Sequence, residues 1–428
     1  MNNIPALYQL YLQHPHIQTD TRQLQKGDLF FALKGPNFNG NLFALRALEQ
    51  GAAYAIIDEP IEGGPADRLF LVPDVLTALQ ELALHHRRQF DIPFIAITGS
   101  NGKTTTKELI HAVLSSSYIT YTTQGNLNNH IGIPLTLLSV KKDAQFAVIE
   151  MGANHQKEIE GYCRYARPTH GLITNAGKAH LEGFGGPEGV KKGKGELYDF
   201  LRAHAGTAFV MWDYDYLRTM SQGIPHIIRY GTKDAELTGV VRPGGGDSFL
   251  RVDITTDLPI GSIQTQLVGD YNLPNVLAAV AIGHHFGVAP DRIRQAIEAY
   301  APSNSRSQLI EKDGNHVILD AYNANPSSMR AAIENFARIP SPKVLVLGAM
   351  AELGPESLNE HRGIVELIGQ YPWQQVVLVG GDFEKIEHPY TRFANSKEAA
   401  GWFRQAGLQG VYILVKGSRS SRMEEVLG

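Results

Sequence analysis

Residues 94–105 read Phe-Ile-Ala-Ile-Thr-Gly-Ser-Asn-Gly-Lys-Thr-Thr. The apolar run Phe94–Thr98 predicts a buried strand, and Thr104–Ser115 predicts a helix. Between them, glycines let backbone N–H groups surround phosphate oxygens, while the helix N-terminus adds a favourable dipole. Lys103 supplies a positive charge, and Thr104 can offer its hydroxyl to Mg²⁺. The usual first glycine of the Walker pattern is absent, but the flanking strand and helix favour a phosphate loop over an ordinary glycine turn.

Strand and helix patterns alternate on both sides of this segment. Short β-branched runs alternate with amphipathic helical segments, which is typical of βαβ units around a mainly parallel sheet. We predict an α/β protein of three domains: a small N-terminal α/β domain at 1–88, a central P-loop ATPase-like domain at 89–302 and a C-terminal Rossmann-like domain at 303–428. The C-terminal region has no Gly-x-Gly-x-x-Gly turn after its first strand, so dinucleotide binding is not indicated.

The individual elements follow from the same patterns. We expect strands at Asp28–Leu33, Ala53–Ile57, Phe146–Ile149, Leu172–Thr174, Thr207–Met211, His316–Leu319, Lys343–Leu347, Gln375–Val379 and Val411–Val415. We expect helices at Phe43–Gln50, Leu76–Phe90, Asn272–Phe286, Ser327–Ala337, Leu358–Gln370 and Ser396–Ala406. Alternating polar and apolar residues from Ile224 to Leu267 predict an antiparallel β insertion, and the glycine run Gly244–Gly246 predicts a loop.

Composition limits the kinds of partner. The 428 residues are 43% hydrophobic and 19% charged, with a net charge of −4, so no general attraction to nucleic acid or to an anionic membrane is expected. Cys163 is the only cysteine, which rules out an internal disulfide and favours a packed thiol. The segment Met1–Gln18 has no pattern of a signal peptide, and no apolar stretch is long enough to span a bilayer. We expect a cytoplasmic protein that acts as a monomer.

Three further segments carry residues suited to chemistry. Glu150 ends the strand after the phosphate loop, where a carboxylate can hold Mg²⁺; alone it would be interpreted as a solvent-facing acid, but the phosphate loop favours the metal role. His180 lies in a glycine-rich loop after another strand, which by itself is a weak signal. Lys191, Lys192 and Lys194 open a helix, and their spacing is typical of a solvated charged face.

These segments together resemble the Mur ligases of peptidoglycan synthesis. The resemblance covers essentially the whole chain. The segments that carry it are Gly99-Ser-Asn-Gly-Lys-Thr-Thr105, Glu150-Met-Gly-Ala-Asn154, His180-Leu-Glu-Gly-Phe-Gly185 and Lys194-Gly-Glu196. Similarity to the members that add D-alanyl-D-alanine to UDP-N-acetylmuramoyl-tripeptide is seen in 125–138, 320–326, 347–354 and 415–419. The resemblance implies an ATP-dependent amide ligase, ADP-forming, that proceeds through an acyl phosphate.

The resemblance also implies roles for individual residues. Lys103, Glu150, His180 and Lys194 would be catalytic, and Thr104, Glu150, His180 and a carbamylated Lys194 would hold two Mg²⁺ ions. The ATP-binding residues would be Gly99, Ser100, Asn101, Gly102, Lys103, Thr104, Thr105, Asn272, Asn275, Arg306 and Asp320. The uridine-linked substrate would meet Asp20, Thr21, Arg22, Asn126 and Asn129.

Two departures from the family pattern concern the nucleotide and the amine. Tyr271 stands where the family usually has His, and Ala349 stands where its Gly-Asp-Met motif has Asp. His361 is one candidate for the base that deprotonates the amine, although a solvated helix residue fits its sequence context better.

Three alternatives remain open at this point. One is the Mur ligase that adds the preceding residue, and it is disfavoured because Asn325-Pro-Ser-Ser328 stands in place of its Asp-Asn-Pro-Arg segment. Another is a folylpolyglutamate synthase, and the third is a nucleotide-binding switch without ligase activity. Glu150, His180 and Lys194 argue against the switch, since a switch has no need of a second metal site.

Overall fold

The structure is a computed structural model that describes residues 3–242, 249–303 and 305–428. The glycine run Gly244–Gly246 lies outside these residues. The contacts between residues divide the chain into two units. The first comprises Met1–Ala96, Tyr118–Gly152 and Glu158–His170, and the second comprises Ile97–Ser117, Ala153–Lys157 and Gly171–Gly428. No helix of the described residues is long and apolar enough to cross a membrane.

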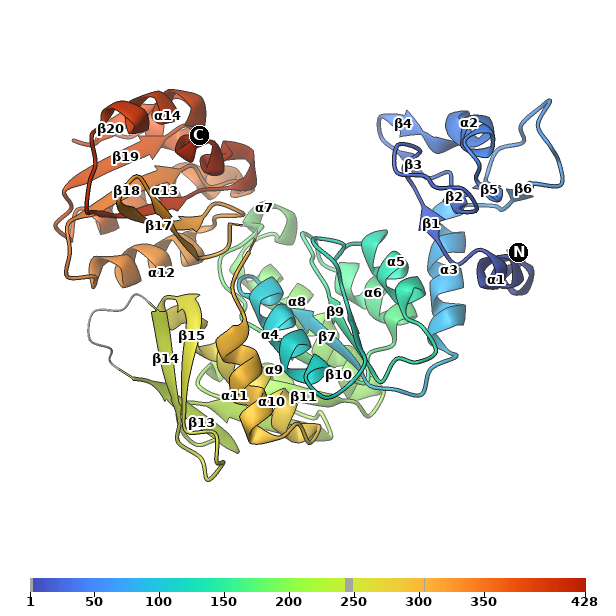
Figure 1. The fold of residues 1–428 in the computed structure, drawn as a ribbon, viewed down its shortest axis with the longest axis horizontal. Coiled ribbons are helices and arrows are strands. Elements are labelled where there is room, and N and C mark those ends of the chain that lie inside the picture. The colour runs from blue at the N-terminus through green and yellow to red at the C-terminus, as the bar shows by residue number, and fades with distance from the viewer. Residues whose placement is uncertain (1–2, 243–248, 304) are drawn as a thin grey trace. The chain divides into compact units, whose positions relative to one another are not determined.

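The N-terminal part of the first unit is a small parallel sheet with helices (Figure 1). Its elements are α1 (Ile4–Gln13), β1 (Ile17–Gln18), β2 (Leu29–Phe31), β3 (Lys34–Gly35), β4 (Phe38–Asn39), η1 (Gly40–Phe43), α2 (Ala44–Glu49), β5 (Tyr54–Ile57), β6 (Leu69–Leu71) and α3 (Val75–Arg87). The sheet order is β1-β2-β5-β6, all parallel. Alternate residues such as Phe30 and Ala55 pack against Ala44, Ala47 and Leu48 of α2, which forms the core of this part.

Arg87, at the end of α3, is a buried cation that joins two segments of the first unit. Its guanidinium donates to Ala166 O at 3.0 Å, Arg167 O at 3.0 Å and Phe90 O at 2.9 Å, and it lies 3.7 Å from the Phe94 ring centroid. Burial lowers the pKa of Arg87 to about 10. The planar guanidinium group therefore donates hydrogen bonds to three carbonyl groups at once.

We expect Arg87→Met to lower the free energy of unfolding by about 3 kcal/mol, because it leaves buried carbonyl groups without donors. Urea unfolding followed by circular dichroism measures the change. Arg88→Met is the matched control, since Arg88 is the exposed residue that follows the last residue of α3 and should change stability by less than about 0.5 kcal/mol. Equal effects of the two substitutions would contradict the role given to Arg87.

The middle of the chain supplies a nine-stranded sheet in the order β15-β14-β13-β12-β11-β10-β7-β9-β8. Its strands are β7 (Phe94–Thr98), β8 (Thr120–Thr122), β9 (Phe146–Glu150), β10 (His170–Ile173), β11 (Thr207–Met211), β12 (His226–Gly231), β13 (Leu237–Val241), β14 (Phe249–Ile254) and β15 (Ser262–Val268). The helices are α4 (Lys103–Ser115), α5 (Gly132–Ser139), α6 (Glu158–Ala166), α7 (Leu181–Phe184), α8 (Pro187–Ala203), α9 (Asp215–Ser221), η2 (Asp270–Asn272), α10 (Leu273–His285) and α11 (Pro290–Ala299).

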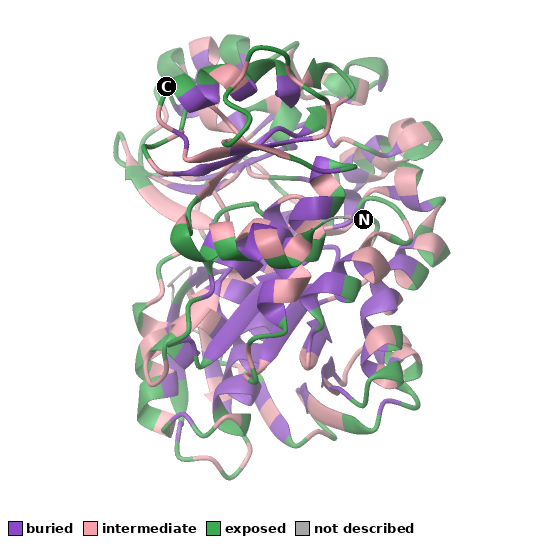
Figure 2. Cartoon of the chain, turned by 90° about the vertical axis from the view of Figure 1, so that its right-hand side faces the viewer, coloured by how far each residue is buried: buried purple, intermediate pink, exposed green. Residues whose placement is uncertain are grey.

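Burial follows the expected pattern in this sheet. Every residue of β7 and β9 is buried, as for strands covered on both faces (Figure 2). β12 is parallel to β11 and to β13, whereas β13–β14 and β14–β15 pair antiparallel, so the predicted antiparallel insertion begins later than Ile224. Cys163 is buried in α6, which confirms the packed thiol.

The C-terminal part of the second unit is a six-stranded sheet in the order β16-β17-β21-β18-β19-β20. Its elements are β16 (Gln308–Lys312), β17 (Asn315–Asp320), α12 (Pro326–Ala337), β18 (Lys343–Gly348), η3 (Gly354–Glu356), α13 (Ser357–Ile368), β19 (Gln375–Val379), η4 (Gly381–Lys385), β20 (Thr391–Phe393), α14 (Ser396–Gln405), β21 (Tyr412–Lys416), η5 (Arg419–Ser421) and η6 (Met423–Leu427). All neighbours are parallel except β16 and β17.

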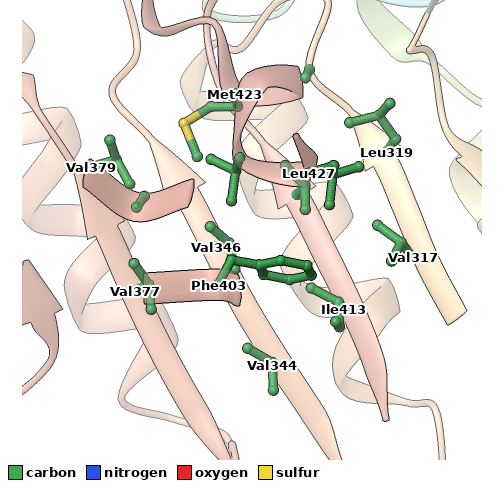
Figure 3. Packing of buried hydrophobic residues seen from close by; sticks show 14 of the residues in the cluster. Val317, Leu319, Val344, Val346, Val377, Val379, Phe403, Ile413, Met423 and Leu427 are labelled. Carbon is green, nitrogen blue, oxygen red and sulfur yellow. The ribbon is translucent and has the colours of Figure 1, made fainter. Parts of the chain in front are cut away.

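Side-chain alternation gives this sheet two apolar faces. Val317, Val346 and Ile413 point to the face covered by Phe403 of α14 and by Met423 and Leu427 of η6 (Figure 3). Helices α12 and α13 lie on the opposite side of the same sheet (Figure 1). The α/β class and the Rossmann-like C-terminal sheet are therefore confirmed.

Candidate active site

The phosphate loop connects β7 to α4 within the second unit. Gly99 has φ +145° and Gly102 has φ +80°, and Gly102 caps the N-terminus of α4. A Cβ on Gly99 would lie 2.0 Å from Thr174 Oγ1, so only glycine fits there. Lys103 Nζ curls over the loop and donates to Gly99 O at 2.7 Å and to Ser100 O at 3.3 Å. The segment thus has the positive charge, the glycine turns and the helix N-terminus that a phosphate group requires.

The loop after β10 supports the phosphate loop from the side. Ser100 N donates to Asn175 O at 2.9 Å, and Asn101 N donates to Asn175 Oδ1 at 3.1 Å. Thr174 Oγ1 and Asn175 Nδ2 both donate to Asn101 O, at 2.6 and 3.1 Å. Thr174 and Asn175 were not predicted from the sequence, because their partners are more than 70 positions away.

The phosphate loop and the loop after β10 also contact the start of α12 and Glu360 of α13. Asn325 Nδ2 donates to Asn101 Oδ1 at 2.7 Å, Lys178 N donates to Ser327 Oγ at 3.0 Å, and Lys178 Nζ pairs with Glu360 at 2.5 Å. Lys178, Ser327 and Glu360 are among the residues that line a cavity of about 380 Å³. The start of α12 is therefore held next to the phosphate loop.

Two side-chain amides connect the start of α10 to α4, the helix that follows the phosphate loop. Asn272 Nδ2 donates to Val268 O, and Asn275 Nδ2 donates to Asn272 Oδ1, both at 2.9 Å. Thr106 Oγ1 of α4 donates to Asn275 Oδ1 at 3.0 Å. Both asparagines, which the resemblance assigned to ATP binding, are buried and hold these elements together.

We expect Gly102→Ala to weaken ATP binding about 10- to 100-fold, because its Cβ would lie 2.7 Å from Asn275 Oδ1 and its φ is left-handed. Isothermal titration with ATP measures the affinity. Gly161→Ala on α6 is the control, since a Cβ there meets nothing within 4 Å and the affinity should stay the same. An unchanged affinity in Gly102→Ala would contradict a phosphate role for this turn.

Residues of the third region assigned to ATP are already engaged in the structure. Asp320 Oδ2 pairs with Lys416 Nζ at 2.6 Å, and its Oδ1 accepts from Ser307 N at 3.2 Å. The Arg306 guanidinium lies 3.6 Å from the Tyr322 ring centroid. The Tyr271 hydroxyl is 2.9 Å from Ser307 Oγ, and burial raises the pKa of Tyr271. Tyr271 thus anchors the beginning of the C-terminal part.

Lys194 is not on a solvated face. The helix α8 begins at Pro187, so Lys194 is in its middle, where the side chain is 1% exposed. Lys194 Nζ donates to Ala153 O at 3.0 Å and lies 4.9 Å from the Phe184 ring centroid. The charged-face interpretation is therefore wrong for this lysine, because the face of α8 that carries Lys194 packs inward.

His180 directly precedes α7, and its side chain faces Glu352 of the loop after β18. Its Nδ1 contacts Glu352 Oε2, and this contact lowers the pKa of Glu352. His361 is 1% exposed: Met350 N donates to its Nε2 at 3.0 Å, and its Nδ1 lies 2.7 Å from Ser357 O. Both ring nitrogens of His361 are used structurally, and burial lowers its pKa. The prediction that His361 is exposed to solvent is therefore wrong. Its contacts do not support a role as the base that deprotonates the amine.

In the first unit, Glu150 is 1% exposed at the end of β9, so it is not a solvent-facing acid. Asn128 Nδ2 donates to Glu150 Oε1 at 2.7 Å, a partner that the sequence did not reveal. Asn129 Oδ1 accepts from Ile131 N and Gly132 N at 3.1 and 2.9 Å at the start of α5, while Asn126 is exposed.

The segment Asp20-Thr21-Arg22 forms a local ion pair in the first unit. The Arg22 guanidinium donates to both oxygens of Asp20, at distances down to 2.6 Å, and lowers the pKa of Asp20 to about 2. Arg22 itself is exposed. Its guanidinium is accessible to an anionic group such as a diphosphate.

Among the described residues, no three His, Cys, Asp or Glu side chains lie close enough together to hold a metal ion. Such a group is not needed for Mg²⁺, which binds through one or two carboxylates, waters and substrate phosphates. The Thr104 hydroxyl in the first turn of α4 and the buried carboxylate of Glu150 are oxygen donors of this kind. The donor types present therefore fit Mg²⁺.

Known families match the chain in three consecutive segments. Residues 15–87 match "Mur ligase family, catalytic domain", residues 97–283 match "Mur ligase middle domain", and residues 305–419 match "Mur ligase, glutamate ligase domain". A Bacillus subtilis protein, UDP-N-acetylmuramoyl-tripeptide–D-alanyl-D-alanine ligase, is 34% identical over 96% of this chain and 92% of its own length. The chain belongs to the Mur ligase family.

Solved structures of Mur ligases agree with this membership. MurF from Acinetobacter baumannii is 33% identical with a TM-score of 0.86, over 96% of this chain and 92% of that one. MurF ligase from Thermotoga maritima in complex with ADP is 26% identical with a TM-score of 0.87, over 100% and 97% of the two chains. The predicted resemblance and fold class are confirmed.

Proposed function

We propose that the chain is an ATP-dependent, ADP-forming ligase that joins D-alanyl-D-alanine to UDP-N-acetylmuramoyl-tripeptide in peptidoglycan synthesis. Similar proteins support this reaction: one is named UDP-N-acetylmuramoyl-tripeptide–D-alanyl-D-alanine ligase, and another is a MurF ligase in complex with ADP. The observation that carries the proposal is the phosphate loop between β7 and α4, with two positive-φ glycines and Lys103 over it. A loop of this kind suits a phosphoryl donor such as ATP.

The proposal assigns one task to each of three domains. Residues 1–88 bind the uridine-linked substrate through Asp20, Thr21 and Arg22, with Asn126 and Asn129 contributing from the next domain. Residues 89–302 bind ATP through Gly99–Thr105, Asn272 and Asn275. Residues 303–428 complete the ATP site through Arg306 and Asp320. The exposed Arg22 guanidinium and the glycine turns of the phosphate loop support these roles.

The reaction needs activation of a carboxylate, because its negative charge repels a nucleophile. A carboxylate oxygen of the tripeptide attacks the γ-phosphorus of ATP, ADP leaves, and an acyl phosphate forms. The dipeptide amine then attacks the acyl carbon, the tetrahedral intermediate loses inorganic phosphate, and the amine gives up a proton. The protein contributes positioning and charge neutralisation. Lys103 and the loop N–H groups hold the phosphate oxygens during the transfer.

Two Mg²⁺ ions would neutralise charge on the phosphates and on the acyl phosphate. Thr104 would bind the ion near the ATP phosphates, Glu150 and His180 would be Mg²⁺ ligands, and a carbamylated Lys194 would hold a second ion. The burial of Lys194 supports this assignment, because a carbamate converts a buried cation into a metal-binding anion. The proposal also assumes a monomer in the cytoplasm.

Phosphate release from ATP tests the function. The purified protein is incubated with ATP, Mg²⁺ and UDP-N-acetylmuramoyl-tripeptide, with and without D-alanyl-D-alanine. We expect release only when both substrates are present. Release with the tripeptide and a different amine would move the assignment to another ligase of this family. ATP binding without release in any mixture would contradict the proposal and favour a nucleotide-binding switch.

A further inference from the structure

The loop Ala349–Gly354, which follows β18, is held in place by its neighbours. Ala349 N donates to Val379 O at 3.0 Å, and Ser418 N donates to Ala349 O at 3.1 Å. Met350 N donates to the buried His361 ring at 3.0 Å. A Cβ on Gly354 would lie 3.2 Å from Glu182 Cβ, so the end of the loop packs on α7. The position of Glu352, inside this loop, is therefore determined by tertiary contacts.

His180 and Glu352 both have left-handed backbone conformations that non-glycine residues rarely adopt. Their φ angles are +52° and +60°. Such conformations persist only when surrounding structure maintains them, and they cluster at functional sites. Here the two strained residues direct their side chains at each other, with Nδ1 of His180 against Oε2 of Glu352. The contact joins segments 172 positions apart in sequence.

The chemistry of the pair defines which nitrogen carries the proton. An ionised carboxylate is only an acceptor, so a neutral His180 ring that faces Glu352 with Nδ1 would carry its proton on Nδ1 and keep the lone pair on Nε2. Histidine ligands of metal ions commonly donate their other N–H to a carboxylate or carbonyl, which fixes the ring and raises the basicity of the free nitrogen. The arrangement of His180 and Glu352 is of this kind.

We propose that Glu352 is a positioning residue that holds His180 as the Nδ1–H tautomer and so presents Nε2 to a divalent cation. The proposal rests on the metal role of His180 in the proposed function. Glu352 itself does not touch the substrates or the metal. It also supplies a carboxylate on the loop in which Ala349 replaces the acid of the family motif.

The tautomer can be observed directly in the full-length protein. With ¹⁵N-labelled histidine, long-range proton–nitrogen NMR distinguishes the two neutral tautomers, and His180→Gln identifies the His180 signals among the 16 histidines. We expect the Nδ1–H form in the unmodified protein and in Glu352→Gln, whose amide oxygen can still accept. In Glu352→Ala we expect the Nε2–H form or a mixture.

Metal affinity gives the second measurement, with Mn²⁺ as the probe and ADP present, followed by electron paramagnetic resonance. We expect Glu352→Ala to weaken Mn²⁺ binding about 10- to 100-fold, and Glu352→Gln to weaken it less. Glu356→Ala, an exposed residue of η3, is the matched control and should change neither measurement. Thermal unfolding of each variant verifies that it is folded.

An unchanged His180 tautomer or an unchanged Mn²⁺ affinity in Glu352→Ala would overturn the proposal. Failure of the ligase assignment can be told apart from this, because neither measurement uses the tripeptide or the dipeptide. If phosphate release did not depend on those substrates, the proposed reaction would be wrong. The measured tautomer of His180 would still test the role of Glu352.

Discussion

Lys103→Met lowers kcat/KM for phosphate release on the order of 1000-fold, and this is the largest effect we expect from a single substitution. Lys103 Nζ lies over the loop carbonyls of Gly99 and Ser100, where a phosphate oxygen can replace them as its partner. Removing a group that neutralises the charge on a transferring phosphate costs this much because little else in phosphoryl transfer is left to the protein. Steady-state kinetics with saturating tripeptide and dipeptide measure the loss.

Two variants sharpen this test. Lys103→Arg keeps the positive charge but replaces the compact ammonium group with a larger planar guanidinium group, so we expect partial activity at most. Lys192→Met removes an exposed lysine of α8 and should leave kcat/KM within about twofold. If Lys103→Met retained full activity, the phosphate loop would not be the site of phosphoryl transfer.

Lys194→Met lowers kcat/KM about 100- to 1000-fold, and it is the second of the large effects. Lys194 is buried in the middle of α8, with its amine 3.0 Å from Ala153 O. Met has a similar length, but it leaves Ala153 O without this donor, so we expect the free energy of unfolding to fall by about 1 to 3 kcal/mol. Circular dichroism at the assay temperature verifies that the variant is folded, so that the loss of activity reports on the chemical role of Lys194.

Carbamylation of Lys194 can be followed separately. Protein prepared in buffer free of carbon dioxide should have reduced activity that bicarbonate restores, and ¹³C-labelled bicarbonate should give a carbamate signal that Lys194→Met lacks. Lys192→Met again serves as the control, because its amine is exposed and should behave as the native protein does. A carbamate signal that persists in Lys194→Met, or full activity in that variant, would contradict the assignment.

Local patterns were sufficient to predict most of the fold. The strands at Phe94–Thr98, Thr207–Met211 and Gln375–Val379 were predicted with the boundaries that the structure has. Most other boundaries differ by one to three residues, because helix and strand ends fray; larger differences are the start of α8 and the start of the antiparallel insertion. The elements that were not predicted include the helices α1, α5, α6, α7, α9 and α11 and short or edge strands such as β16 and β20, whose apolar alternation is too brief to detect.

The sequence by itself determined the α/β class, the phosphate loop and the family, because each depends on residues close together in the chain. Strand and helix periodicity, glycine turns and a lysine at a helix start are local features. These motifs can be recognised without knowing which distant residues they contact.

Only the tertiary structure decided which side chains are buried and what they touch. Lys194 is buried because one face of α8 packs inward, and His361 is structural because Met350 donates to it. Glu352 meets His180 because two distant loops pack on α7. Burial and pairing depend on segments that are far apart in sequence, and the periodicity of a single segment contains no information about its partner.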